Sequence, residues 1–279
     1  MSTPPNLFQQ VFLAMEARDY ERARQLVKEG LVSDPTFVKG KNITVANWLL
    51  LAADWALITQ LLPQRTNFFV ESGWLQSLGQ NRPINAEKAP IPWFTYPAID
   101  FLEQRLRPNL SVFEFGSGMS TLWWSKRVRF VHAVDHDVAW HKTVKTQLDQ
   151  SPNRNWQVDL LTKEGDYVRA IAASSHGPFD VVVIDGEWRN ACARMVLNCI
   201  KEDGMIVFDN SDRASFADGI RFLSAAGWRR LDFFGLIPCY LYKNCTSVFF
   251  RDERVLNTDL LPSEFRSSVG CTCSQAIGE

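Results

Sequence analysis

The chain has 279 residues, and its 46% hydrophobic and 22% charged residues are typical of an ordinary globular protein. Its 30 basic residues nearly balance 31 acidic ones, which leaves a formal net charge of -1. This balance gives no electrostatic argument for binding to nucleic acid or to an anionic membrane, and we expect neither partner.

The N-terminal region, residues 1–63, is predicted to be helical. Apolar residues recur at helical spacing in two runs, 8–15 and 20–31, before Asp34-Pro35 closes the second run. This pair resembles one tetratricopeptide-type helical hairpin, and one such unit does not make an array. We interpret it as a helical cap on the main domain, with a surface for a protein partner or for self-association as the alternative.

No targeting or membrane-spanning segment is recognisable in the sequence. The first residues lack a basic segment followed by an apolar core, so we expect no signal peptide, a cytoplasmic location and reduced cysteines. The most apolar stretch, 48–62, is shorter than a membrane span and contains Asp54. Cys271 and Cys273 form a Cys-x-Cys pair near the end of the chain, and two thiolates alone are an incomplete zinc site.

Residues 64–97 form a stretch rich in proline and aromatic residues. Connections inside compact domains are mostly short, so a stretch of this length and composition is typical of a functional loop. We predict an irregular connector or a lid. Its characteristic residues are Pro83, Pro90, Pro92 and Pro97, with Trp74, Trp93, Phe94 and Tyr96 between them.

Strand and helix patterns alternate through residues 98–252, which predicts a parallel sheet with helices on both faces. The predicted strands are 111–115, 130–134, 156–160, 180–184 and 205–208, and the predicted helices include 138–148, 189–200 and 214–226. Two further strands, 229–234 and 246–250, lie close together in the sequence, which favours an antiparallel pair. The expected fold is α/β, a doubly wound, mostly parallel seven-stranded sheet with an N-terminal helical extension and a polar tail over 253–279.

A glycine-rich turn follows the first predicted strand. The run 112–118 has the pattern of a strand that stops at Gly116-Ser117-Gly118 and leads into a helix. Such a turn lets a ligand approach bare backbone and aims the free N–H groups of the helix start toward it. Asp135 ends the next predicted strand, where a carboxylate can accept hydrogen bonds from a ribose diol. Together these features predict an adenosine-containing cofactor.

The glycine pattern separates two kinds of cofactor. A dinucleotide-binding turn has a third glycine where this chain has Thr121, and the pattern here is Glu-x-Gly-x-Gly. With this pattern the chain resembles the class I S-adenosylmethionine-dependent methyltransferases, from about residue 94 to 251. The motifs that carry the resemblance follow one another in order, at 114–118, 131–135, 165–167, 179–186 and 204–210. The resemblance implies a Rossmann-like methyltransferase fold that binds S-adenosylmethionine.

The resemblance also implies a cofactor site. Its residues are Glu114, Gly116, Ser117, Gly118, Asp135, Asp166 and Asp185. The glycines would allow backbone contact with the amino-acid end of the cofactor, Glu114 would help to hold its ammonium group, and Asp135 would bind the ribose hydroxyls. Asp166 would lie near the adenine amino group, with a helix N-cap or first-turn acid as the alternative. The alternative for Glu114 is a strand-end residue that bonds the backbone of the turn.

Two predicted strands of the second half end in polar residues, Asp185 and Asp209-Asn210. Both ends face the ligand crevice of a doubly wound sheet, and three oxygen ligands there suit Mg²⁺ or Ca²⁺. This set resembles the divalent-metal-dependent O-methyltransferases of the catechol and caffeoyl-coenzyme A type, which implies a metal-bound substrate hydroxyl. Those enzymes carry a lysine three residues after the first aspartate, where this chain has Trp188 followed by Arg189. Arginine stays protonated and suits gripping a substrate carboxylate or phosphate.

The sequence therefore predicts an enzyme that methylates a small-molecule acceptor, at a hydroxyl oxygen, with Asp185, Arg189 and Asp209 as catalytic residues. Without a metal, Asp185 would orient cofactor and substrate and Asp209-Asn210 would shape a polar turn. The predicted acceptor-pocket residues are Trp93, Tyr96, Trp188, Arg189 and Arg213. Aminopropyl transfer is one alternative, although Arg189 beside Asp185 disfavours a polyamine. A non-enzymatic scaffold that binds the cofactor and a protein partner is the other.

Overall fold

The computed structural model describes residues 68–270 and, before them, residues 10, 13, 14, 17, 19, 21–23, 25, 26 and 29. Residues 13 and 14 and residues 21–23 are helical, with a turn at Ala17 between them. The rest of the predicted N-terminal hairpin lies outside the described residues, as does the Cys271/Cys273 pair. Within the described part of the chain, no helix is long and apolar enough to cross a membrane.

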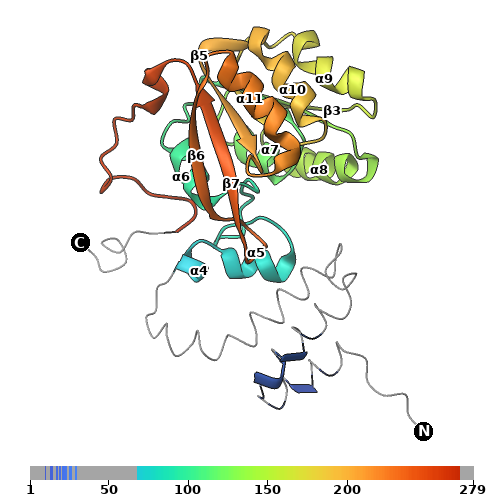
Figure 1. Ribbon diagram of the computed structural model, residues 1–279, viewed down its shortest axis with the longest axis vertical. Coiled ribbons are helices and arrows are strands. Elements are labelled where there is room, and N and C mark those ends of the chain that lie inside the picture. The colour runs from blue at the N-terminus through green and yellow to red at the C-terminus, as the bar shows by residue number, and fades with distance from the viewer. Residues whose placement is uncertain are drawn as a thin grey trace.

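A seven-stranded sheet forms the centre of the structure (Figure 1). Its strands are β1 (Ser111–Phe115), β2 (Phe130–Asp135), β3 (Trp156–Leu160), β4 (Phe179–Ile184), β5 (Ile200–Asp209), β6 (Arg229–Leu236) and β7 (Lys243–Phe250). The strand order is β3-β2-β1-β4-β5-β7-β6. Strands β1 to β5 are parallel, and β7 is antiparallel to both of its neighbours. The predicted fold class, doubly wound and mostly parallel, is confirmed.

The strand order reverses beside β1. The chain passes from β1 outward to β2 and β3, then returns to place β4 on the other side of β1. In doubly wound sheets the crevice beyond the carboxyl ends of the strands at such a point is where ligands bind. The site is therefore expected where β1 and β4 end.

Helices cover both faces of the sheet. They are α4 (Phe68–Glu71), α5 (Trp74–Gln80), α6 (Tyr96–Glu103), α7 (Met119–Ser125), α8 (Val138–Gln150), α9 (Glu164–Ala173), α10 (Arg189–Met195) and α11 (Ala217–Ala225), with short 3-10 helices at Val196–Asn198, Ala214–Phe216 and Glu253–Leu256. Figure 1 shows α9, α10 and α11 gathered on one side of the sheet. Helices α5, α6 and α7 pack on the other side.

Alternate residues along the strands build these two cores. Val181 and Val183 of β4 face the core under α6 and α7, while Val182 and Ile184 face the core under α9 and α10. All of these side chains are fully buried. A strand covered on both faces reads as a continuous apolar run, which is why β4 was predictable from sequence.

The helix predicted over 189–200 is shorter than expected. Helix α10 ends at Met195, a 3-10 turn follows, and β5 begins at Ile200, which pairs with Phe179 of β4. A short apolar run fits a helix or a strand equally well, so tertiary pairing decides its structure here.

The segments on either side of the α/β domain are also attached to it. The stretch predicted as irregular contains the short helices α4 and α5, and residues 81–95 follow without a helix or a strand of the sheet. From the tail, the Ser267 hydroxyl donates to Asp100 (2.5 Å), the Ser268 N–H donates to Glu103 (2.8 Å), and Val269 is buried. The described part of the tail is therefore packed against α6, and the role of residues 64–97 as a lid stays a prediction.

Candidate active site

The glycine turn after β1 lies against the end of β4. Gly116 has a φ of 96°, and a Cβ on it would lie 2.7 Å from the Cα of Gly186. A Cβ on Gly186 would in turn lie 2.1 Å from the hydroxyl of Tyr167. Neither position has room for a side chain, so two bare backbone segments meet at the switch point of the sheet. Sequence analysis did not predict a role for Tyr167, whose hydroxyl lies against Gly186.

Glu114 is buried beneath this turn. The Thr121 hydroxyl donates to its Oε2 (2.5 Å) and accepts a hydrogen bond from the N–H of Gly118 (2.9 Å). The other carboxylate oxygen, Oε1, accepts no well-aligned hydrogen bond within the described part of the chain, although the side chains of Ser120 and Trp124 approach the carboxylate. Burial raises the pKa of Glu114 to about 8, against the opposing effect of Ser120, Thr121 and Trp124. A buried carboxylate oxygen without a partner is costly, and a donor from a ligand would remove that cost.

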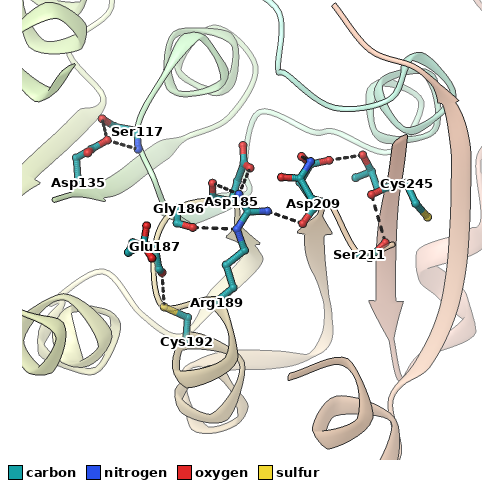
Figure 2. A network of polar contacts seen from close by, with 12 residues as sticks. Ser117, Asp135, Asp185, Gly186, Glu187, Arg189, Cys192, Asp209, Ser211 and Cys245 are labelled. Atoms are coloured by element: carbon teal, nitrogen blue, oxygen red, sulfur yellow. Dashed lines mark hydrogen bonds and ion pairs between the residues drawn. The ribbon is translucent and has the colours of Figure 1, made fainter. Parts of the chain in front are cut away.

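Asp135 joins the end of β2 to the turn (Figure 2). The N–H and the hydroxyl of Ser117 both donate to its Oδ2, at 2.9 and 2.7 Å, and the N–H of Asp137 donates to its Oδ1 (3.0 Å). Trp140, which the sequence analysis missed, donates from its indole to the carbonyl of Ser117 (2.7 Å). The carboxylate and the turn are therefore held together before any ligand binds.

Two cavities open on either side of Ser117, Trp140 and Asp185, which line both. The first, of about 440 Å³, is also lined by Gly116, Asp135, His136, Asp137, Gly186, Glu187 and Arg189. The second, of about 320 Å³, is also lined by Pro83, Trp93, Gly118, Met119, Ser120, Asp209, Asn210, Arg213, Ile237, Tyr240 and Tyr242. The fold thus brings together at one sheet edge the predicted glycines, Asp135, Asp185 and Asp209-Asn210.

Arg189 bridges the ends of β4 and β5 (Figure 2). Its guanidinium donates to the carbonyls of Gly186 (2.8 Å), Asp209 (2.5 Å) and Asp185 (2.7 Å), and pairs with the Asp185 carboxylate (3.0 Å). The same group lies over the ring of Phe216 at 4.8 Å. Most of its donors are occupied by the protein, so the geometry favours a positioning role for Arg189 over the predicted grip on a substrate.

Asp209 is a buried carboxyl group at the end of β5. The Thr246 hydroxyl donates to its Oδ1 (2.6 Å), and the Asn210 side-chain amide donates to its Oδ2 (2.7 Å). Burial and the negative charge of Asp185 raise the pKa of Asp209. Burial also raises the pKa of Asp185, against the opposing effect of Arg189 and Arg213. These two carboxyl groups share one positively charged neighbour.

The predicted metal ligands Asp185, Asp209 and Asn210 lie together at this edge of the sheet, and their binding of a divalent cation stays a prediction. Arg189 forms an ion pair with the Asp185 carboxylate, and both oxygens of Asp209 already accept hydrogen bonds. These contacts would compete with a metal ion for the same oxygens.

Asp166 lines neither of the two cavities. It stands in the first turn of α9 and pairs with Arg169 (3.3 Å), with more than half of its side chain exposed. It lines a separate hollow with His132 and Asp159. Asp166 is thus a first-turn acid, as the alternative had it, and its contact with adenine stays a prediction.

Two of the five residues predicted for the acceptor pocket line the second cavity, and the pocket itself stays a prediction. Trp93 and Arg213 line the second cavity, whereas Tyr96 is buried in the core and Trp188 packs on Tyr167 at 5.2 Å between ring centroids. Arg189 lines the first cavity. The sequence analysis missed the segment between β6 and β7, which supplies Ile237, Tyr240 and Tyr242. The only local feature in the sequence that could have pointed to this segment is its aromatic residues near Pro238.

Comparisons with known proteins give structural neighbours alone. No protein-family model matches the chain, and a search of curated proteins finds no match. Among solved structures, the O-methyltransferase TomG from Streptomyces achromogenes is 14% identical, with 70% of this chain and 94% of TomG covered and a TM-score of 0.47. The precorrin-6y C5,15-methyltransferase from Geobacter metallireducens is also 14% identical, covering 56% of this chain and 87% of that one, with a TM-score of 0.46. A precorrin-8w decarboxylase from Methanobacterium thermoautotrophicum is 18% identical, covering 61% of this chain and 96% of that one, with a TM-score of 0.44. Similarity at this level assigns no activity, so the function must be argued from the site.

Proposed function

We propose that this protein is an S-adenosylmethionine-dependent methyltransferase that acts on a hydroxyl oxygen of a small-molecule acceptor. The observation that carries the proposal is the buried, unpartnered Oε1 of Glu114 beneath the Gly116–Gly118 turn. An ammonium group is a donor that such an oxygen can bind strongly, and Asp135 stands at the end of the adjacent strand.

The cofactor would lie across the turn. Glu114 would bind its ammonium group, the backbone of Gly116 and Gly118 would contact its amino-acid end, and Asp135 would accept hydrogen bonds from the ribose. The glycines fit this assignment because Gly116 and Gly186 keep the cradle free of side chains, while Glu114 lies beneath the turn and lines neither cavity. When bound, S-adenosylmethionine supplies a methyl group activated by a positively charged sulfur.

Asp209 is the residue placed to handle the acceptor's proton. It lines the second cavity beside Gly118, and Thr246 and Asn210 fix the orientation of its carboxylate. Its raised pKa makes its carboxylate a stronger base than that of an ordinary aspartate. The acceptor hydroxyl would give its proton to Asp209 as the oxygen becomes nucleophilic, and Arg189 would keep the ends of β4 and β5 in register.

The first test is calorimetric titration of S-adenosylhomocysteine into the wild-type protein and Asp135→Asn. Loss of the ribose acceptor should weaken binding by at least about tenfold. Asp149→Asn is the matched control, because Asp149 lies on the exposed face of α8 in a pair with Lys145. Absence of binding to the wild-type protein contradicts the proposal.

The second test is methyl transfer from S-adenosylmethionine to a panel of hydroxylated small molecules, with Asp209→Asn as the variant that removes the base. Cofactor binding without transfer to any acceptor would favour the scaffold alternative. Transfer to amines with no transfer to hydroxyls would retain the methyltransferase and contradict the oxygen specificity.

A further inference from the structure

Arg213 brings a positive charge to the second cavity. Its backbone N–H donates to the carbonyl of Asn210 (3.0 Å), which closes the turn after β5 and holds Arg213 next to the Asp209 end of the cavity. Within the described part of the chain, its guanidinium makes no hydrogen bond or ion pair with another residue. The nearby carboxylate of Asp185 is already paired with Arg189.

The wall of the same cavity is aromatic and fixed in place. The rings of Trp93 and Tyr240 stack at 5.8 Å with an angle of 25° between their planes, and Tyr240 and Tyr242 lie 5.0 Å apart. The Trp93 indole donates to the carbonyl of Pro238 (2.8 Å), and the Tyr240 carbonyl accepts from the indole of Trp74 (3.0 Å). Flat, rigid aromatic surfaces favour a planar ligand, because little side-chain entropy is lost when it stacks.

The volume and the polar groups limit the size of that ligand. At about 320 Å³ the cavity is near the lower end of the range for small-molecule sites. It offers the unpaired guanidinium of Arg213, the buried carboxyl group of Asp209 and the aromatic rings described above. A guanidinium binds carboxylate and phosphate through paired hydrogen bonds, which it cannot form with a neutral group.

We propose that the acceptor is a small aromatic hydroxyl compound that carries an oxyanion, a carboxylate or a phosphate, and that Arg213 binds this oxyanion while the hydroxyl faces Asp209. This inference rests on the proposed function and adds the chemical class of the acceptor. Arg213 is then the residue that sets specificity, and the role predicted for Arg189, gripping a substrate anion, falls to Arg213.

The experiment measures binding of three probes by calorimetry, with and without saturating S-adenosylhomocysteine. The probes are 4-hydroxybenzoate, 4-hydroxyphenyl phosphate and the neutral 4-hydroxybenzamide. The proteins are wild type, Arg213→Gln, Arg213→Lys and the control Arg221→Gln, whose guanidinium is exposed on α11 and paired with Asp218. Comparing 4-hydroxybenzoate with 4-hydroxyphenyl phosphate distinguishes a carboxylate from a phosphate as the preferred oxyanion.

We expect the wild-type protein and Arg221→Gln to bind at least one oxyanion probe about tenfold more tightly than the amide. Arg213→Gln should lose this preference while its affinity for the amide stays the same, and Arg213→Lys should keep part of it. A wild-type protein that prefers neither oxyanion, or a preference that survives in Arg213→Gln, overturns the inference.

Two further outcomes of this experiment distinguish a failure of this inference from a failure of the proposed function. S-adenosylhomocysteine also carries a carboxylate, so a large loss of its affinity in Arg213→Gln would assign Arg213 to the cofactor and overturn the inference. An oxyanion preference that depends on Arg213, in a protein that binds no S-adenosylhomocysteine, would support the anion site and contradict methyl transfer.

Discussion

Thr121 donates a hydrogen bond to the buried carboxylate of Glu114 across 2.5 Å, and its own oxygen accepts from the N–H of Gly118 (2.9 Å). The Thr121 side chain therefore fixes both the first turn of α7 and the orientation of Glu114, which is the only acidic residue among residues 111–118. The same residue stands where a dinucleotide-binding turn would have its third glycine. Its hydroxyl gives this position a function that a glycine could not supply.

Thr121→Val is expected to weaken S-adenosylhomocysteine binding by about tenfold and to lower the free energy of unfolding by about 1–3 kcal/mol, because it leaves two buried polar groups without a partner. Calorimetry and urea denaturation measure the two effects. Thr121→Ser should retain most of both. Thr143→Val on α8 is the control, since the Thr143 hydroxyl bonds an exposed helix carbonyl. Unchanged affinity in Thr121→Val would contradict the assignment of Glu114 to the ammonium group.

Cofactor affinity is expected to rise with pH between about 6 and 8. Burial raises the pKa of Glu114 to about 8, so the carboxyl group is mostly protonated at pH 6 in the free protein. Binding an ammonium group favours the ionised form, so binding releases a proton and becomes tighter as pH rises, by up to about tenfold per pH unit. Titrations in buffers of different ionisation enthalpy measure that proton. Glu114→Gln should bind weakly and with no pH dependence from this group; an equal pH dependence in the variant would contradict the prediction.

Most of the sheet could be predicted because its strands are covered on both faces. Runs such as 181–184 contain only apolar residues, and their length and their position between helical patterns indicate parallel strands. Gly116 and Asp135 were predictable for a similar reason: each follows directly from where a strand ends. The roles of Glu114 and Ser117 depend on hydrogen bonds that form only once the turn has folded.

The rest of the site depends on contacts between segments far apart in the sequence. Arg189 bonds carbonyls at the ends of two strands, and no sequence pattern shows which carbonyls will face a side chain. Trp93 and Tyr240 are 147 positions apart, yet their rings form one wall. The position of Asp166 depended on where α9 begins, a boundary that sequence patterns locate poorly.

Chelation of divalent metals is expected to leave methyl transfer unchanged. Arg189 already neutralises Asp185, and Thr246 and Asn210 already bond both oxygens of Asp209. Transfer rates with EDTA and with added Mg²⁺ check this once an acceptor is known, and titration of MgCl₂ into the cofactor-bound protein checks it earlier. A rate lost in EDTA and restored by Mg²⁺ would establish the metal-dependent mechanism and make Asp185, Asp209 and Asn210 its ligands.

Arg189→Gln is expected to lower the free energy of unfolding by about 3–5 kcal/mol, because it leaves the Asp185 carboxylate without its partner and frees three carbonyls at the ends of β4 and β5. Urea denaturation measures this loss, and Arg221→Gln should change stability by less than about 0.5 kcal/mol. Arg189→Lys separates positioning from substrate contact, since an ammonium keeps the charge but cannot span the same carbonyls. If Arg189 positions the strand ends, Arg189→Lys should be destabilised and should lose cofactor affinity and turnover together. If Arg189→Lys instead keeps full stability and only its KM for anionic acceptors rises, Arg189 contacts the substrate.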